Sequence, residues 1–553
     1  MESLERHIED LYSEELAVKT TATAQIGGLF RRVQHLPVLL QHPSLLSVLE
    51  RCLREDGRWS LDLSIHILST FFALSQFSQF HAKLLELRVG ATAMDTLELA
   101  MRRVHHRESV SRPGTAAALR PATGSRPPTR TAADQRSSIT SLWPPLSSRG
   151  PPLSPAPFSG ADDGRLESLI WLALGALTNL AEAAEVAPKM LARGVVPLLA
   201  RLLPWPSAHV EQLAITLLLQ LSAPGDIIDT GIVPRLVQSV SCADQQTAEL
   251  AMRLLHNLSF HEKGRKAMVS AGAIPKVTKA LQRQPGGWAV LYHLSMEDAH
   301  KPLFMAQLPL VYQHFIHTED FRSAPELLAL AVNLTHDRRI AEELGRSKDR
   351  VGKLMAKARG DPLAFKIMRN LSQHGGPAVQ ALFGPFIPDI ITTVMDPTSE
   401  TELIVEAMGT LVNLSLPQYD WQSTMANSAL PTWLASKLVV GQADDDIILE
   451  AIMLTATVCN KDSAPNTADA GLGQLLISLL ADRKDDDEFV LQIIGLYYIL
   501  DLLEDPNPAV EHAARVAVNV VLASGGHWAE QVTMLHTQAN GSGWQDVPVF
   551  QQA

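Results

Sequence analysis

One pattern of apolar and polar positions returns along most of the chain. Leucines flank a polar residue and are followed by a small one at Leu177–Ala181 (LTNLA), Leu218–Ser222 (LLQLS), Leu255–Ser259 (LHNLS), Leu291–Ser295 (LYHLS), Val332–Thr335 (VNLT), Met368–Ser372 (MRNLS) and Leu411–Ser415 (LVNLS). We call this pattern the N-L-S phrase. Its polar positions are Asn179, Gln220, Asn257, His293, Asn333, Asn370 and Asn413. A phrase that recurs at intervals of about 40 residues predicts an α-solenoid of armadillo or HEAT type.

The sequence before each phrase favours the three-helix armadillo unit. In AGAIPKVTKAL, Gly272 marks the end of one helix and Pro275 suits the first turn of the next. Gly194 with Pro197 and Gly231 with Pro234 repeat this arrangement. The third helix, expected over Glu249–Phe260, then carries the phrase. The predicted fold class is an all-α armadillo-repeat superhelix interrupted by one disordered insert.

The third helices have an apolar face and a polar edge. Leu250, Leu254, Leu255 and Leu258 form the apolar face, and Asn257 lies beside it, one turn after Arg253. Stacked amides could hold an extended peptide backbone in the concave groove, because an amide both donates and accepts hydrogen bonds. The candidate peptide-binding residues are Asn179, Arg253, Asn257, Asn333, Lys366, Asn370 and Asn413. The alternative, that each Asn satisfies nearby backbone, stays open, and Gln220 and His293 interrupt the series.

The chain divides by composition into four parts. Residues 1–108 read as helices with one degenerate repeat at Leu61–Leu74, and the main array is expected over 165–525, followed by a tail at 526–553. Between them, residues 109–164 are rich in Pro, Ser and Arg, with Asp134 as the single acid up to Gly160. This composition predicts disorder. The insert is read either as a passive spacer or as a tether tuned by phosphorylation, for which Ser154-Pro155 is a candidate site.

Composition and charge exclude several classes of protein. The 553 residues are 46% hydrophobic but only 5% aromatic, which suits packed helices. A net charge of −12 argues against nucleic-acid binding, which needs a basic surface. The longest apolar stretch identified, Phe489–Leu500, is shorter than the ~20 residues that span a bilayer, so we expect no membrane insertion. The chain start lacks a hydrophobic signal core. Together these features predict a soluble intracellular protein.

Residues that carry chemistry are scattered. Cys52, Cys242 and Cys459 lie far apart and form no metal-binding pair. The sequence contains none of the common nucleotide-binding or hydrolase motifs. The acidic runs Asp444–Asp446 and Asp485–Glu488 precede apolar helices, where acids complement the helix dipole. We therefore expect no enzyme, no metal and no cofactor.

Six stretches carry a resemblance to a known family. They are Leu53–Ser60 (LREDGRWS), Phe77–His81 (FSQFH), Leu291–Asp298 (LYHLSMED), Met368–Pro377 (MRNLSQHGGP), Gly409–Trp421 (GTLVNLSLPQYDW) and Asp486–Ile494 (DDEFVLQII). FSQFH, the QHGGP continuation and DDEFVLQII are the specific ones. With them the chain resembles the kinesin-associated protein family, from about residue 2 to Trp528 apart from the insert.

The resemblance implies a non-catalytic adaptor of the kinesin-2 motor complex. Its expected partners are the tails of the two motor chains and ciliary cargo or intraflagellar transport proteins. Its expected location is the cytoplasm and cytoskeleton, in particular the cilium or flagellum and its base. The chain differs from that family in a short start, in the Pro/Ser/Arg-rich insert and in a shortened repeat after Leu500. The alternatives are an armadillo scaffold of another class, such as a nuclear import receptor, or a GTPase-regulating protein.

Overall fold

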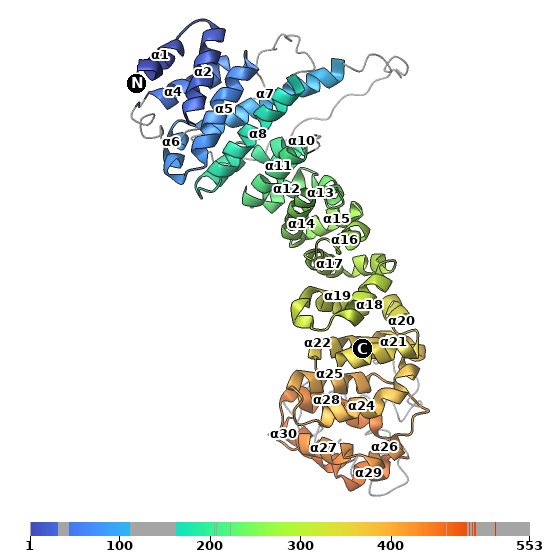
Figure 1. The fold of residues 1–553 in the computed structure, drawn as a ribbon. Helices are drawn as coiled ribbons and strands as arrows, with labels where there is room; N and C mark the ends of the chain where they lie inside the picture. The colour runs from blue at the N-terminus through green and yellow to red at the C-terminus, as the bar shows by residue number, and fades with distance from the viewer. Residues whose placement is uncertain are drawn as a thin grey trace, which may run out of the picture. The chain divides into compact units, whose positions relative to one another are not determined.

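The computed structural model consists of α-helices and short 3-10 helices, with no strand among the residues it describes (Figure 1). These are residues 2–30, 42, 44–110, 162–203, 205, 207–221, 223–460 and 462–483, with the single positions 486, 489, 492, 493 and 515. Most of the insert (residues 111–161), the apolar stretch at 489–500 apart from three positions, and the tail lie outside them. Contacts divide the chain into two compact units, Met1–Leu294 and Ser295–Ala553.

The first unit begins with helices that belong to the same solenoid as the repeats. Its elements are α1 (Glu2–Asp10), α2 (Leu16–Phe30), α4 (Leu45–Asp56), α5 (Leu61–Ser75), η2 (Ser78–Phe80), α6 (His81–Glu86), α7 (Val89–Val110), α8 (Asp162–Leu180), α9 (Val186–Ala192), α10 (Val195–Leu202), α11 (Ala208–Leu221), α12 (Pro224–Asp229), α13 (Val233–Ser239), α14 (Gln245–Ser259), α15 (Glu262–Ser270), α16 (Ala273–Ala280) and α17 (Gly287–Ser295).

The two sides of the insert pack against each other. Helix α7 ends at Val110 and α8 begins at Asp162, so the first and last few residues of the expected insert are helical. Helix α8 contacts both α5 and α7, and Arg193, after α9, pairs with Asp95 of α7 at 2.6 Å. Residues before and after the insert therefore form one packed body.

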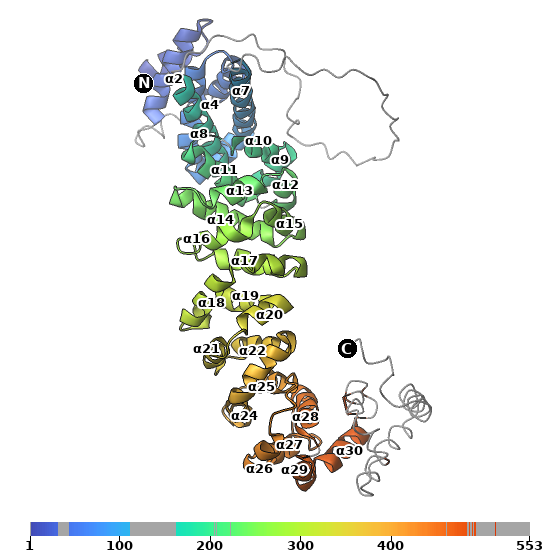
Figure 2. The ribbon, with the colours of Figure 1, turned by 90° about the vertical axis from the view of Figure 1, so that its right-hand side faces the viewer.

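Third helices stack in chain order within this unit. Helix α2 packs on α5 and α5 on α8 (Figure 1). Helix α8 then packs on α11, and α11 on α14 (Figure 2). The leucines of the N-L-S phrase are buried between these helices. They are Leu177, Leu180, Leu218, Leu255 and Leu258, and all are fully enclosed. Burying a leucine side chain contributes roughly 1.5–3 kcal/mol, so each repeat depends on its neighbours for stability.

The breaks between helices follow the glycine and proline pattern of the sequence. Gly194, Gly231 and Gly272 have φ values of 84°, 72° and 72°, a left-handed conformation that glycine adopts without steric cost. Helices α10 and α16 begin directly after Gly194 and Gly272, and α13 begins two residues after Gly231. The predicted armadillo break is confirmed at all three places.

Helix α14, the third helix of its repeat, begins four residues earlier than predicted. Helix α14 starts at Gln245 rather than Glu249, because the Asp244 carboxylate accepts a hydrogen bond from the Thr247 backbone N–H at 2.7 Å. An N-cap of this kind stabilises a helix by about 1 kcal/mol. The apolar spacing of the leucines does not extend to this polar first turn, so periodicity alone misses it.

The second unit repeats the same construction. Its elements are η3 (Asp298–Phe304), α18 (Leu308–His317), η4 (Phe321–Ser323), α19 (Pro325–Thr335), α20 (Arg338–Leu344), α21 (Lys348–Ala358), α22 (Pro362–His374), α23 (Gly376–Gln380), η5 (Ala381–Phe386), α24 (Ile387–Met395), α25 (Thr401–Val412), α26 (Trp421–Asn427), α27 (Leu430–Lys437), α28 (Asp445–Val458), α29 (Ala464–Asp469) and α30 (Leu472–Asp482). The third helices α19, α22, α25 and α28 again pack in order.

Residues 376–395 are long and apolar enough to cross a membrane. In the structure they are divided among α23, η5 and α24, with Pro385 inside η5. Phe383, Ile387, Ile390 and Val394 are buried among neighbouring helices. These buried positions and the division into three short helices fit a segment of one repeat that packs through one face.

Candidate functional site

The polar position of the phrase contacts the preceding phrase. In the first unit, Asn179 Nδ2 donates to Ser75 Oγ at 2.9 Å, which joins α8 to the end of α5. His293 occupies the same position in its repeat, and its Nδ1 lies 2.6 Å from Ser259 Oγ. Ser75 and Ser259, each at the end of its third helix, are thus the hydrogen-bond partners of Asn179 and His293.

The second unit repeats this contact three times. Asn333, Asn370 and Asn413 donate through Nδ2 to Ser295 Oγ at 3.1 Å, Thr335 Oγ1 at 2.9 Å and Ser372 Oγ at 3.2 Å. Asn370 also donates to the Val332 carbonyl at 3.2 Å and is only 3% exposed. We name this series of bonds the amide ladder. It joins consecutive repeats, and at Asn370 it leaves almost no surface for a peptide.

Arg253 and Asn257 differ from the other candidates. Both side chains are exposed on α14 and make no hydrogen bond or ion pair with any residue that the structure describes. Ser222, which ends the preceding phrase, lies outside the described residues. Of the seven candidate residues, these two present open polar groups.

Lys366 belongs to a charged cluster that spans three third helices. Its Nζ lies 3.5 Å from Glu406 Oε1 of α25. Arg369, also on α22, approaches Glu406 at 3.7 Å and reaches Glu450 of α28 at 2.5 Å. We call Arg369, Glu406 and Glu450 the Arg369 bridge. Its members lie in three different repeats, so no local sequence pattern predicts the bridge.

Burial controls the chemistry of this bridge. Glu450 is 5% exposed, and burial raises its pKa, which the charge and hydrogen bond of Arg369 oppose. Gly409 makes the reach from α22 to α28 possible, because a methyl group at this position would overlap the Arg369 guanidinium. The absence of a side chain at Gly409 therefore opens the path across α25.

Histidines gather where the phrases end. In the first unit, the His256 and His293 rings stack at 5.3 Å between centroids, with the Phe260 ring 4.4 Å from His293. In the second, His336 and His374 lie 5.6 Å apart. Burial lowers the pKa of His293, His336 and His374, and nearby cations lower each further, Arg265 at His293 and Lys301 at the other two. All three side chains therefore favour the neutral form.

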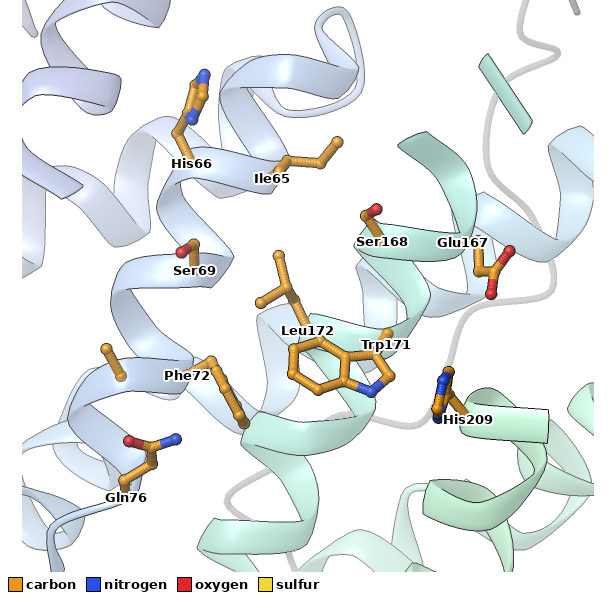
Figure 3. A pocket seen from close by; sticks show the side chains of 11 residues that line it. Ile65, His66, Ser69, Phe72, Gln76, Glu167, Ser168, Trp171, Leu172 and His209 are labelled. Atoms are coloured by element: carbon orange, nitrogen blue, oxygen red, sulfur yellow. The ribbon is translucent and has the colours of Figure 1, made fainter. Parts of the chain in front are cut away.

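An open pocket lies on α5, α8 and α11 of the first unit (Figure 3). Its volume is about 630 Å³, and its lining includes Phe72, Glu167, Ser168, Trp171 and His209. The Phe72 and Trp171 rings meet edge to face at 5.0 Å between centroids. We call it the Trp171 pocket. One sequence feature could have indicated this pocket: Glu167 precedes Trp171 by one helical turn on a third helix.

Metal-binding chemistry finds no support in the part of the chain that the structure describes. No group of three or more His, Cys, Asp or Glu side chains converges there. Cys52, Cys242 and Cys459 are free thiols, and burial raises the pKa of Cys52 and Cys242. A raised thiol pKa disfavours the reactive thiolate.

Comparison with known proteins gives a family and a fold. A family model described as kinesin-associated protein (KAP) matches residues 1–518. A solved structure, described as showing that a conserved phosphorylation switch controls the interaction between cadherin and beta-catenin, aligns over 95% of this chain and 99% of its own. Its TM-score is 0.61 and its sequence identity 13%. A designed armadillo repeat protein aligns over 53% of this chain and 99% of its own, with 15% identity and a TM-score of 0.35.

At 13% identity the first of these structures is similar in fold alone. With the all-helical elements and the recurring break, it confirms the predicted all-α armadillo-repeat class.

Proposed function

Because the chain belongs to the kinesin-associated protein family, we propose that it is the non-catalytic adaptor subunit of the kinesin-2 motor complex. In this role it binds the tails of the two motor chains and links them to cargo. The observation that carries the proposal is the family match over residues 1–518, a range that contains every helix given above.

We further propose that the cargo consists of ciliary or intraflagellar transport proteins, with action in microtubule-based intraciliary transport and cilium assembly. The protein would then act in the cytoplasm, on the cytoskeleton and at the cilium or its base. A solenoid suits such work, because its repeats present a long surface on which two partners can bind at separate places.

The candidate groove residues remain our proposed contacts for a peptide partner. Within that set, Arg253 and Asn257 are the best placed, since both are exposed on α14. Lys366 is half-buried and paired with Glu406, so a peptide partner would meet the two side chains together rather than a free cation. Asn179, Asn333, Asn370 and Asn413 would serve mainly to hold adjacent third helices in register, because their amide N–H groups are engaged.

The test is a pull-down of the full chain with each tail of a heterodimeric kinesin-2. We expect the pair of tails to retain the protein at physiological salt, with circular dichroism confirming helical structure in the same preparation. Failure of both tails to bind a folded preparation would refute the motor role. Binding of the tails without any transport protein from ciliated cells would leave the motor role standing and refute the ciliary cargo.

A further inference from the structure

The Trp171 pocket combines an aromatic pair and aliphatic side chains with polar groups. Phe72 meets Trp171 edge to face, and Ile65 and Leu172 also line the pocket (Figure 3). Gly175, one turn further along α8, gives Phe72 its space, since a methyl group there would come within 2.6 Å of Phe72 Cε2. The aromatic pair is thus held by packing on one side and open on the other.

Trp171 keeps much of its surface in contact with solvent. Its side chain is 36% exposed, although it belongs to a helix whose other large apolar residues are buried. An indole face available in a concave site attracts cations through its quadrupole as well as apolar groups. Tryptophan is also the residue type most often responsible for binding energy at interfaces.

The pocket has one unpaired charge, and it is negative. Glu167 lies one helical turn before Trp171 on α8 and makes no ion pair with any residue in the described ranges. The cation nearest to it in sequence, Arg165, is paired with Asp62 at 3.3 Å. The remaining polar groups of the lining are hydroxyls, an amide and the imidazoles of His66 and His209. An anionic ligand would find repulsion here, and a cation would find a free carboxylate.

We propose that the Trp171 pocket binds an arginine or lysine side chain from a basic segment of a partner protein. The cation would lie against the Trp171 indole and donate hydrogen bonds to the Glu167 carboxylate, while its aliphatic stem packs on Ile65 and Leu172. Arginine suits the site better than lysine, because its planar guanidinium can stack on an aromatic ring and pair with a carboxylate at once.

Charge complementarity extends beyond the pocket. The whole chain has a net charge of −12, which attracts a basic partner to its surface before docking. The same charge opposes nucleic acid. The proposal does not depend on the motor assignment, since it concerns the chemistry of one docking site and holds for any basic protein segment.

The experiment measures binding of the full chain to a short fluorescein-labelled peptide that carries two arginines among alanines and leucines, by fluorescence anisotropy. A twin peptide with citrulline in place of both arginines has the same shape without the charge. We expect the arginine peptide to bind at least about tenfold more tightly than its twin, and less tightly as salt rises.

Variants locate the binding on the protein. Glu167→Gln removes the charge without changing the shape, and we expect about fivefold weaker binding. Trp171→Ala should weaken binding about tenfold. Trp171→Phe keeps an aromatic ring and so preserves more of the packing, and its affinity should lie between those of the unchanged chain and Trp171→Ala. Glu182→Gln, an exposed acid beyond the end of α8, is the matched control and should leave the affinity unchanged.

Three outcomes would overturn the proposal: no binding of the arginine peptide up to about 1 mM, equal binding of both peptides, or equal losses for Glu167→Gln and Glu182→Gln. None of them bears on the pull-down with kinesin-2 tails, so the docking site and the adaptor role fail or stand separately.

Discussion

The Trp171 pocket and the Arg369 bridge contain the same kind of acidic residue in opposite roles. Both place carboxylates on third helices. In the first unit Glu167 makes no ion pair with a described residue and lies beside an exposed tryptophan. In the second, Arg369 pairs with Glu406 of the next repeat and with Glu450 of the repeat after that. A polar residue on a third helix can therefore either join two repeats or stay available to a partner protein. The residue type alone does not determine which of these roles it has.

The largest expected effect comes from breaking the Arg369 bridge. Arg369→Met leaves the buried Glu450 carboxylate without its cation, and we expect a loss of about 2 kcal/mol in local stability, because an unpaired buried charge is costly. Hydrogen exchange of α22, α25 and α28 measures it. Adding Glu450→Gln should recover part of the loss, since the charge that needed a partner is then gone.

The control for this change is Arg338→Met. Arg338 pairs with Glu342 at 2.8 Å on an exposed helix surface. Removing such a pair should cost no more than about 0.5 kcal/mol. Equal losses for the two variants would mean that the bridge contributes no more than a surface ion pair.

The amide ladder gives the next effect. Asn370→Ala removes a buried amide that donates to Thr335 Oγ1 and to the Val332 carbonyl, and we expect a loss of about 1–2 kcal/mol. Asn257→Ala changes the same position of the phrase where the side chain is exposed, and should stay within about 0.5 kcal/mol. Chemical denaturation followed by circular dichroism compares them. Similar losses would show that burial does not separate the two positions.

Acid should destabilise both units through the histidines. Because the folded-state pKa of His293, His336 and His374 lies below the ordinary value, the unfolded chain binds protons more readily. Stability is therefore complete above pH ~6.5 and declines as the pH falls below it, levelling off once the folded histidines are also protonated. Melting temperatures across this range measure the decline.

His293→Asn is the matched variant for the pH experiment. It restores the residue found at this position in other phrases and can still bond to Ser259 Oγ. The variant should melt with a weaker dependence on pH than the unchanged chain. An unaltered pH dependence would assign the acid sensitivity to other groups.

The smallest effect on stability is expected from the exposed polar pair on α14. Arg253→Glu with Asn257→Ala should change stability by less than about 0.5 kcal/mol, while it weakens the binding of a peptide partner in the groove. Affinity for a kinesin-2 tail, measured beside a melting curve, separates the two effects. Unchanged affinity would place the motor contact on another surface.

The repeat architecture was predictable because it rests on local signals. Leucine spacing identifies the buried face of each third helix, and Gly272 followed by Pro275 identifies a break whose conformation only glycine adopts easily. Helix starts were less predictable. Asp244 begins α14 through a side-chain cap, which periodicity does not register.

The use of each polar residue was not predictable, because it depends on contacts between repeats. Asn257 and Asn370 occupy the same position of the phrase, yet one is exposed and the other buried. In the Arg369 bridge, Glu406 and Glu450 lie about 40 and about 80 residues after Arg369. Over such separations the spacing in the sequence does not show which side chains meet. The Trp171 pocket likewise needs α5 and α8 to meet across the insert.

Gly409 has a consequence for how this solenoid unfolds. Stability in repeat proteins is usually described as a sum of terms for each repeat and for each pair of adjacent repeats. By clearing a path across α25, Gly409 lets Arg369 couple α22 directly to α28, which is a contact between second neighbours. Opening of α25 would then disturb the Arg369–Glu450 pair, which joins the helices on either side of it. These three repeats should behave as one cooperative block, and the boundary of that block, rather than the single repeat, sets how far a disturbance spreads along this unit.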